Sequence, residues 1–142
     1  YLKAMKGGNK KLPTKGTVFL SISNKLKVEF IELAQRLKKL GFKLIATKGT
    51  AAHLRSSKID SKVIWRISDK KSPDILSIMR EGNVNLIINL PTGRRAATDG
   101  AQMRRLAVEL GIPFITTITG ADAAIKSLEE GENNYLMPIN KK

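Results

Sequence analysis

The chain has 142 residues and a mass of 15.6 kDa, which is the size of one ordinary domain and too small for two. It contains no cysteine and a single histidine, so a disulfide framework, a thiolate nucleophile and cysteine- or histidine-rich metal sites are excluded. Lysine and arginine outnumber aspartate and glutamate by 26 to 12, a formal net charge of +14, which favours anionic partners.

The N-terminal half begins with a linker and continues with strands and helices in alternation. Residues 1–16 are rich in lysine, glycine and proline and lack apolar periodicity, which predicts a connecting segment from a preceding domain. After it, β-branched apolar runs alternate with stretches of helical period. In chain order we expect a strand at Thr17–Ile22, a helix at Val28–Leu40 ended by Gly41, a strand at Lys43–Ala46, a helix at Thr50–Ser57 and a strand at Lys62–Trp65.

The C-terminal half continues the alternation. Ser72 is expected to cap a helix with Pro73 at its first position, and Asp99 to cap the next helix, which Gly111 ends. In chain order we expect a helix at Pro73–Arg80, a strand at Asn85–Asn89, a helix at Asp99–Leu110, a strand at Ile112–Thr116, a helix at Ala121–Glu129 and a polar tail over residues 131–142.

This order of elements predicts an α/β fold over residues 17–130. Strands joined by helices pair in parallel through right-handed crossovers, so we expect a single doubly wound sheet of five parallel strands with helices on both faces, a Rossmann-like three-layer arrangement. In open sheets of this kind ligands bind at the carboxyl ends of the strands. The loops that follow the strands therefore form the candidate site.

The loop after the second strand has the composition of an anion site. Gly49 lets a ligand approach the backbone, the amides of the next helix are free, and Thr47 and Thr50 place hydroxyls beside Lys48. The alternative is structural: Thr50 caps the helix and Gly49 turns the chain.

Three further loops add candidates. After the fourth strand, Asn89, Thr92, Gly93 and Arg94 suit a phosphate or carboxylate, although a solvated loop or a contact to a neighbouring domain is an equal interpretation. Lys27 opens the first helix, where a cation is unfavourable unless an anion offsets it. Trp65 and Arg66 end the third strand, where the tryptophan is more often a half-buried edge residue than a ligand contact.

The positive charge also has other interpretations. Many lysines fall on predicted solvated helix faces, as solubility alone would produce. A nucleic-acid binder would need exposed aromatic residues among the basic ones, and the chain has only seven aromatics, so nucleic acid is not the expected partner. No apolar run approaches the length of a membrane span and the start lacks the apolar region of a signal peptide, which predicts a cytoplasmic protein without membrane contact.

Several separated motifs carry a family resemblance. GTVFLSIS, GFKLIATKGTAAHL, IINLPTGRR, RRLAVELGIPFITT and GADAAIKSL together resemble the methylglyoxal-synthase-like domain that closes the large chain of carbamoyl phosphate synthetase. The resemblance covers residues 16–128, and the leader YLKAM with its basic linker is similar to the junction that precedes this domain.

The resemblance implies an allosteric, non-catalytic domain without a cofactor of its own. The parent enzyme would be an ATP-dependent, glutamine-hydrolysing ligase of arginine and pyrimidine biosynthesis that uses Mg or Mn. Its partners would be the rest of the large chain, the glutaminase small subunit and a small anionic effector.

The resemblance leaves the effector open. In members regulated by UMP and IMP, the matching phosphate and ribose contacts are Lys27, Thr47, Thr50, Arg66 and Asn89. In the branch regulated by N-acetylglutamate, a tryptophan after the third strand and an Asn-Leu-Pro turn belong to the pocket, and this chain has Trp65 and residues 89–91 at the matching positions. The following Thr-Gly-Arg-Arg is like that of the nucleotide-regulated members, which favours a nucleotide.

Methylglyoxal synthase itself is a lower-ranking alternative. It eliminates phosphate from dihydroxyacetone phosphate with a carboxylate base on a GGDxQ-type loop and a histidine near the fourth helix, because enolisation needs a proton acceptor and an electrophile. Neither motif occurs here, and Asp99 is better explained as a helix cap.

Overall fold

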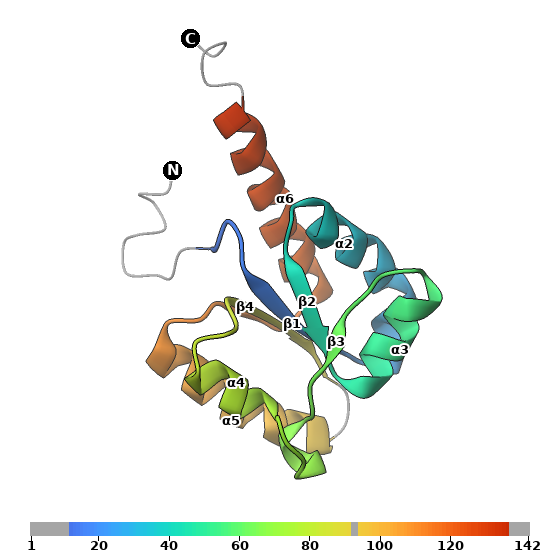
Figure 1. The fold of residues 1–142 in the computed structure, drawn as a ribbon, viewed down its shortest axis with the longest axis vertical. Coiled ribbons are helices and arrows are strands. Elements are labelled where there is room, and N and C mark those ends of the chain that lie inside the picture. Colours follow the sequence, from blue (N-terminus) through green and yellow to red (C-terminus); the bar gives the residue numbers. More distant parts are fainter. Residues whose placement is uncertain (1–11, 92–93, 137–142) are drawn as a thin grey trace.

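The computed structural model describes residues 12–91 and 94–136, without the side chains of 68, 94–99 and 132–136. Its centre is a sheet of five parallel strands in the order β3-β2-β1-β4-β5 (Figure 1). The predicted doubly wound parallel sheet is confirmed. The strands are β1 (Thr17–Ile22), β2 (Lys43–Ala46), β3 (Lys62–Val63), β4 (Leu86–Leu90) and β5 (Phe114–Ile115).

The helices cover both faces of the sheet because the apolar side chains of each strand alternate between the faces. Val18 and Leu20 of β1 pack with one group of helices, and Phe19 between them packs with the other. The first group is α2 (Lys27–Lys39), α3 (Lys48–Ser56) and α6 (Ile118–Leu136), and the second is α4 (Ile75–Arg80) and α5 (Arg94–Leu110) (Figure 1). The short 3₁₀ turns are η1 (Asn24–Leu26) and η2 (Ile67–Asp69).

The order of the strands places a crevice at one edge of the sheet. The chain runs outward from β1 to β2 and β3, and then returns to the other side of β1 for β4 and β5. The loops after β1 and β4 therefore leave toward opposite faces and separate at the carboxyl ends of the strands.

Four helix starts differ from the sequence prediction by two or more residues, and that of α2 differs by one. Helix α3 begins at Lys48 with Thr47 at its N-cap, so Thr50 is not the cap and Gly49 lies in the first turn. The predicted cap at Ser72 and start at Pro73 are wrong, because α4 begins at Ile75 and Asp74 caps it by accepting a hydrogen bond from the Ser77 amide at 2.9 Å.

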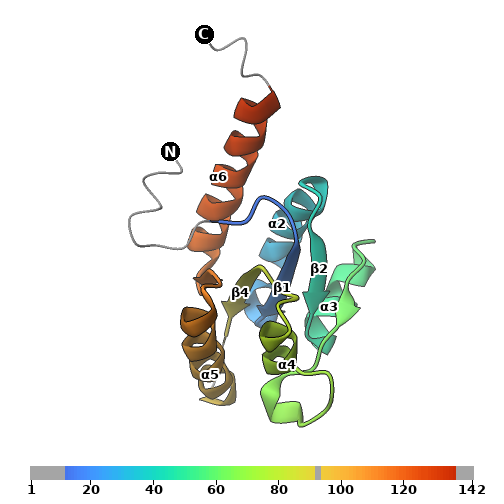
Figure 2. The same ribbon diagram turned by 60° about the vertical axis from the view of Figure 1, so that its left-hand side comes forward.

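The other two differences concern the longer helices. Helix α5 begins at Arg94, so the predicted cap at Asp99 lies inside the helix. Helix α6 begins at Ile118 rather than Ala121 and continues to Leu136, into the segment expected to be a polar tail, and it extends beyond the strands (Figure 2). The predicted third strand ends at Val63, and Trp65 forms only an isolated bridge with Asp74.

The end of the predicted linker takes part in the fold. Leu12 is half-buried and packs against the core, and the Gly16 carbonyl accepts a hydrogen bond from the Lys43 amide at 2.9 Å. Gly16 has φ +126°, and a Cβ there would overlap the Asn85 side chain, whose Oδ1 accepts the Thr17 amide proton at 2.8 Å. Glycine is therefore required at the entry to β1.

A cluster of charged side chains joins α2 to α6. The Arg36 guanidinium donates to both carboxylate oxygens of Glu129, at 2.9 and 2.8 Å, and to Asp122 Oδ1 at 2.8 Å. These bonds lower the pKa of both carboxyl groups below their ordinary values. The bidentate geometry orients the long C-terminal helix against α2.

We expect Glu129→Gln to lower the free energy of unfolding at pH 7 by up to about 1 kcal/mol, since the pair is partly solvent-exposed. Because Arg36 lowers the pKa of Glu129 in the folded state, this stabilisation is present above the unfolded-state pKa of about 4.3 and is lost as the pH falls through the lower folded-state value. Urea unfolding at several pH values measures it. Glu130→Gln, at an exposed neighbour, is the control, and equal effects at the two positions would contradict the assignment.

Candidate functional site

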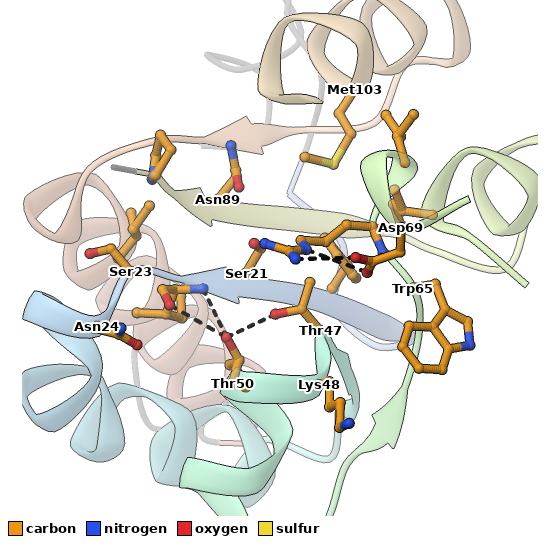
Figure 3. A pocket seen from close by; sticks show the side chains of 18 of the residues that line it. Ser21, Ser23, Asn24, Thr47, Lys48, Thr50, Trp65, Asp69, Asn89 and Met103 are labelled. Carbon is orange, nitrogen blue, oxygen red and sulfur yellow. Dashed lines mark hydrogen bonds and ion pairs between the residues drawn. The ribbon is translucent and has the colours of Figure 1, made fainter. Parts of the chain in front are cut away.

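A cavity of about 510 Å³ opens at the carboxyl ends of four strands. Its walls come from the segments that follow β1, β2, β3 and β4, together with Met103 of α5 (Figure 3). This is the edge of the sheet where the strand order reverses direction, so the predicted position of the site coincides with the cavity.

The structure brings most of the predicted site residues together around this cavity. Of the others, Thr92 and Gly93 lie outside the described residues, and Arg94 begins α5 with its side chain not described. The predicted residues that line the cavity are Lys27, Thr47, Lys48, Gly49, Thr50, Trp65, Arg66 and Asn89. Their role in binding stays a prediction.

Two buried threonines join the end of β1 to the first turn of α3. Thr50 Oγ1 accepts a hydrogen bond from the Ile22 amide at 3.0 Å and lies 3.0 Å from Thr47 Oγ1 (Figure 3). Thr47 and Thr50 are 7% and 2% exposed. Since the Thr50 hydroxyl already has partners in the chain, its first role is to fix the start of α3 beneath the cavity.

The first turn of α3 supplies backbone donors to the cavity. The first amides of a helix have no carbonyl four residues earlier in the helix to bind, and the positive end of the helix dipole lies beside them. Lys48 and Gly49 occupy these positions and line the cavity. The N-terminus of a helix is therefore suited to binding an anion.

Lys27 brings a cation to the same end of the cavity. Its ammonium donates to Asn24 Oδ1 at 2.7 Å, and it lies so close to Gly49 that an added Cβ would be 3.0 Å from Nζ. Partial burial lowers the pKa of Lys27, because the ammonium loses part of its hydration. An anion bound here would offset that cost.

The cavity wall also holds an ion pair. Arg66 donates to Asp69 through Nη2 at 3.1 Å and Nε at 3.4 Å, and both residues line the cavity with Trp65. The Arg66 guanidinium holds the pKa of Asp69 below its usual range. Trp65 is half-buried, and the Lys71 ammonium lies 4.6 Å from its ring centroid.

Asn89 lies near the carboxyl end of β4, in the cavity wall. The residue is 4% exposed, and Gly100 of α5 packs so closely that an added Cβ would be 2.9 Å from Asn89 Nδ2. Because Gly100 has no side chain, α5 can pack directly against the side-chain amide of Asn89 in the cavity wall.

The cavity-wall residues that the sequence analysis did not select include the polar Ser21, Ser23, Asn24 and Asp69 and the apolar Met103. Three of them follow or end the first strand, and that position at a strand end was the available signal. The Ser23 hydroxyl is buried without a hydrogen-bond partner among the described residues. Asp69 and Met103 belong to segments with no local pattern that points to a site.

The chemistry available to the cavity is that of anion binding. The described lining includes three cationic side chains, Lys27, Lys48 and Arg66, against the one carboxylate of Asp69. Within residues 12–91 and 94–136, no three metal-ligating side chains form a cluster, and no helix is long and apolar enough to cross a membrane.

We expect Thr50→Val to lower the free energy of unfolding by about 1 to 3 kcal/mol, because the buried Ile22 amide loses its acceptor while the side-chain shape is kept. Thermal and urea unfolding measure the change. Thr119→Val, at an exposed position in α6, is the matched control and should alter stability by less than about 0.5 kcal/mol. Equal stabilities of the two variants would show that the Thr50 hydroxyl does not join β1 to α3.

We expect Gly49→Ala to weaken binding of inorganic phosphate by about threefold to tenfold, because the new methyl group displaces the Lys27 ammonium. Stability should stay or rise by up to about 1 kcal/mol, since alanine is the better helix former. Gly131→Ala in α6, where an added Cβ meets nothing within 4 Å, is the control and should leave phosphate binding unchanged. Unchanged binding in Gly49→Ala as well would place the anion away from Lys27.

Comparison with known proteins agrees with the resemblance found in the sequence. The family model described as the MGS-like domain matches residues 29–116. The carbamoyl phosphate synthase large chain, C-terminal section, of Methanocaldococcus jannaschii is 44% identical over 129 residues, which cover 91% of this chain and 21% of the relative. The protein of the same name from Methanopyrus kandleri is 42% identical over 130 residues, covering 91% of this chain and 24% of the relative.

A solved structure supports the fold. The crystal structure of methylglyoxal synthase from Elizabethkingia anophelis superposes with a TM-score of 0.65 at 19% identity, covering 80% of this chain and 79% of that one. This likeness concerns the fold alone, and the chain spans less than a quarter of the two relatives that it matches in sequence. With a family match over the greater part of its length and a parallel sheet of the corresponding architecture, the chain belongs to the MGS-like domain family.

Proposed function

We propose that this domain binds a small anionic effector in the cavity and thereby regulates a carbamoyl phosphate synthase large chain of which it is a part. The observation that carries the proposal is the joint approach of Lys27 and the first turn of α3 to one end of the cavity. The choice of carbamoyl phosphate synthase as the regulated enzyme rests on the relatives that are named as its large chain. The ATP-dependent reaction and its metal ions would belong to other parts of that enzyme.

Electrostatics at the Lys27 end support an anion. The ammonium is partly desolvated and its contact to Asn24 is to a neutral oxygen, so a bound phosphate or carboxylate would supply the missing counter-charge. The backbone amides at Lys48 and Gly49 add donors that need no reorganisation. The candidates are UMP and IMP, which carry one phosphate on a neutral body, and N-acetylglutamate, which carries two carboxylates.

A binding role fits the cavity better than the elimination of phosphate. An enolising enzyme needs a proton acceptor, and the carboxylate of the described lining, Asp69, is paired with Arg66, which lowers its pKa and weakens it as a base. No histidine is among the described lining residues to act as an electrophile. We therefore place methylglyoxal synthase activity second.

Regulation requires that the effector change the equilibrium between two states of the whole enzyme, and the coupling is reciprocal between the two sites. Assays of carbamoyl phosphate synthesis with and without effector in the complete enzyme test this part. A change in rate or in substrate affinity supports it, and an effector that binds without either change contradicts it.

We expect at least one of UMP, IMP and N-acetylglutamate to bind the domain in isothermal titration calorimetry, and Lys27→Met to weaken that binding by about tenfold or more. Lys25→Met removes an equal charge from an exposed neighbour that does not line the cavity, and it should change the affinity by less than about twofold.

The pH dependence gives a second test of Lys27. Binding favours its protonated form, so affinity should fall as the pH rises through the lowered pKa of the free domain, and Lys27→Met should lack that decline. Equal effects of the Lys25 and Lys27 substitutions would mean that net charge, not the cavity, attracts the anion. Turnover of dihydroxyacetone phosphate to methylglyoxal would contradict the assignment to a binding domain.

A further inference from the structure

We infer that Gly100 is a positioning residue of the cavity: because it has no side chain, the side-chain amide of Asn89 can lie against α5 and leave the cavity open for the body of a nucleotide. This inference rests on the proposed function and concerns the part of the ligand beyond its anionic group. Gly100 is not among the described lining residues, so it acts through Asn89.

The first step is the direction of the Asn89 side chain. Side chains alternate along a strand, and Ile87, two residues before Asn89, packs in the core beneath α4 and α5. Ile88 and Leu90 pack on the other face of the sheet. Asn89 therefore faces α5, and parallel pairing with Ser21 of β1 holds its backbone. Since it is almost fully buried and lines the cavity, its side chain lies between the helix and the cavity.

The second step is the close approach of α5. Gly100, Met103 and Ala107 follow one another at helical spacing and are all buried, so they form the face of α5 that packs on the sheet. Met103 lines the cavity together with Asn89 (Figure 3). A Cβ on Gly100 would lie 2.9 Å from Asn89 Nδ2, closer than the two atoms can pack. Any larger residue at position 100 therefore displaces the Asn89 amide.

The third step is the direction of that displacement. The backbone of β4 is fixed by its pairing with β1 and β5, whereas Nδ2 is the end of a side chain that can rotate. α5 lies on one side of the amide and the buried core surrounds its strand, so the cavity is the open side. A side chain at position 100 therefore turns the amide into the cavity and changes binding more than stability.

The fourth step is which part of a ligand the amide meets. The Thr47 amide, at the start of α3, donates to the Leu20 carbonyl of β1, and Ser21 of β1 pairs with Asn89 on the other side. With β1 between them and strands about 4.8 Å apart, Asn89 is about 10 Å across the sheet from the start of α3. A phosphate ion held by α3 and Lys27 does not span this width, whereas the sugar and base of a nucleotide do.

The test compares UMP with inorganic phosphate in calorimetry. We expect Gly100→Ala to weaken UMP by about fivefold to tenfold and phosphate by less than about twofold, while the midpoint of thermal unfolding stays or rises because alanine is the better helix former. Gly120→Ala is the matched control. An added Cβ there also lies 2.9 Å from a side-chain atom, Thr117 Oγ1, but neither residue is among the described cavity lining, so both affinities should change by less than about twofold.

A double-mutant cycle with Asn89→Ala separates a role through Asn89 from a general effect on packing. Asn89→Ala removes the amide, so adding Gly100→Ala to it should not weaken UMP further. If Gly100→Ala alone fails to fold, the double variant, which lacks the overlap, should fold and bind UMP as Asn89→Ala does.

Three results would overturn the inference and leave the proposed function standing, provided that phosphate binding depends on Lys27. They are an equal weakening of UMP and phosphate by Gly100→Ala, an unchanged affinity for UMP, and a further loss in the double variant. A wild-type domain that binds phosphate but not UMP would overturn it as well. Absence of binding of both ligands to the wild type would contradict the inference and the proposed function together.

Discussion

The site depends on one hydrogen-bonded junction between the end of β1 and the start of α3. Thr50 Oγ1 accepts the Ile22 amide proton and contacts Thr47, so the first turn of the helix is fixed against the central strand. These groups are almost fully buried, where an unsatisfied amide is costly. The junction sets the direction of the α3 amides, and through Gly49 it sets the space that the Lys27 ammonium occupies.

The rest of the fold supports this junction with two separate hydrophobic cores. β1 lies between β2 and β4 at the centre of the sheet and is buried from both faces, so its end is among the most firmly held points of the chain. The cavity forms where the segments after β1 and β4 separate. A rigid floor of buried strands thus carries walls made of turns and helix ends, the arrangement that preorganises a binding site.

Much of the fold and part of the site follow from local sequence patterns. The period of the apolar residues predicts the parallel sheet, and the segment 46–50 predicts a turn that lines the cavity, because composition and spacing within a few residues decide both. That this turn binds an anion stays a prediction. The first residue of a helix is harder to predict from the sequence, since several neighbouring residues can each act as its N-cap. Asp74 caps α4 although Ser72 and Pro73 have the usual pattern, and Thr47 takes the cap position while Thr50 turns inward to β1.

Contacts between distant residues explain what sequence reasoning missed. Arg36 meets Asp122 and Glu129 across 86 and 93 residues, and no local pattern indicates the pairing. The Arg66–Asp69 pair is local, yet its importance comes from the cavity that it faces, which only the fold assembles. The charge inside the cavity depends on which side chains the fold brings together there, whereas the net charge of +14 indicates only that the chain as a whole favours anions.

We propose that the first turn of α3 and Lys27 together hold the anion. A titration of the isotope-labelled domain with UMP, followed by proton–nitrogen correlation NMR spectra, tests this directly. We expect saturable shifts of the Lys48 and Gly49 backbone amides and of the Lys27 ammonium, with small shifts on the outer faces of α2 and α6. Shifts confined to exposed lysines on those outer faces, with the α3 amides unchanged at saturation, would contradict it.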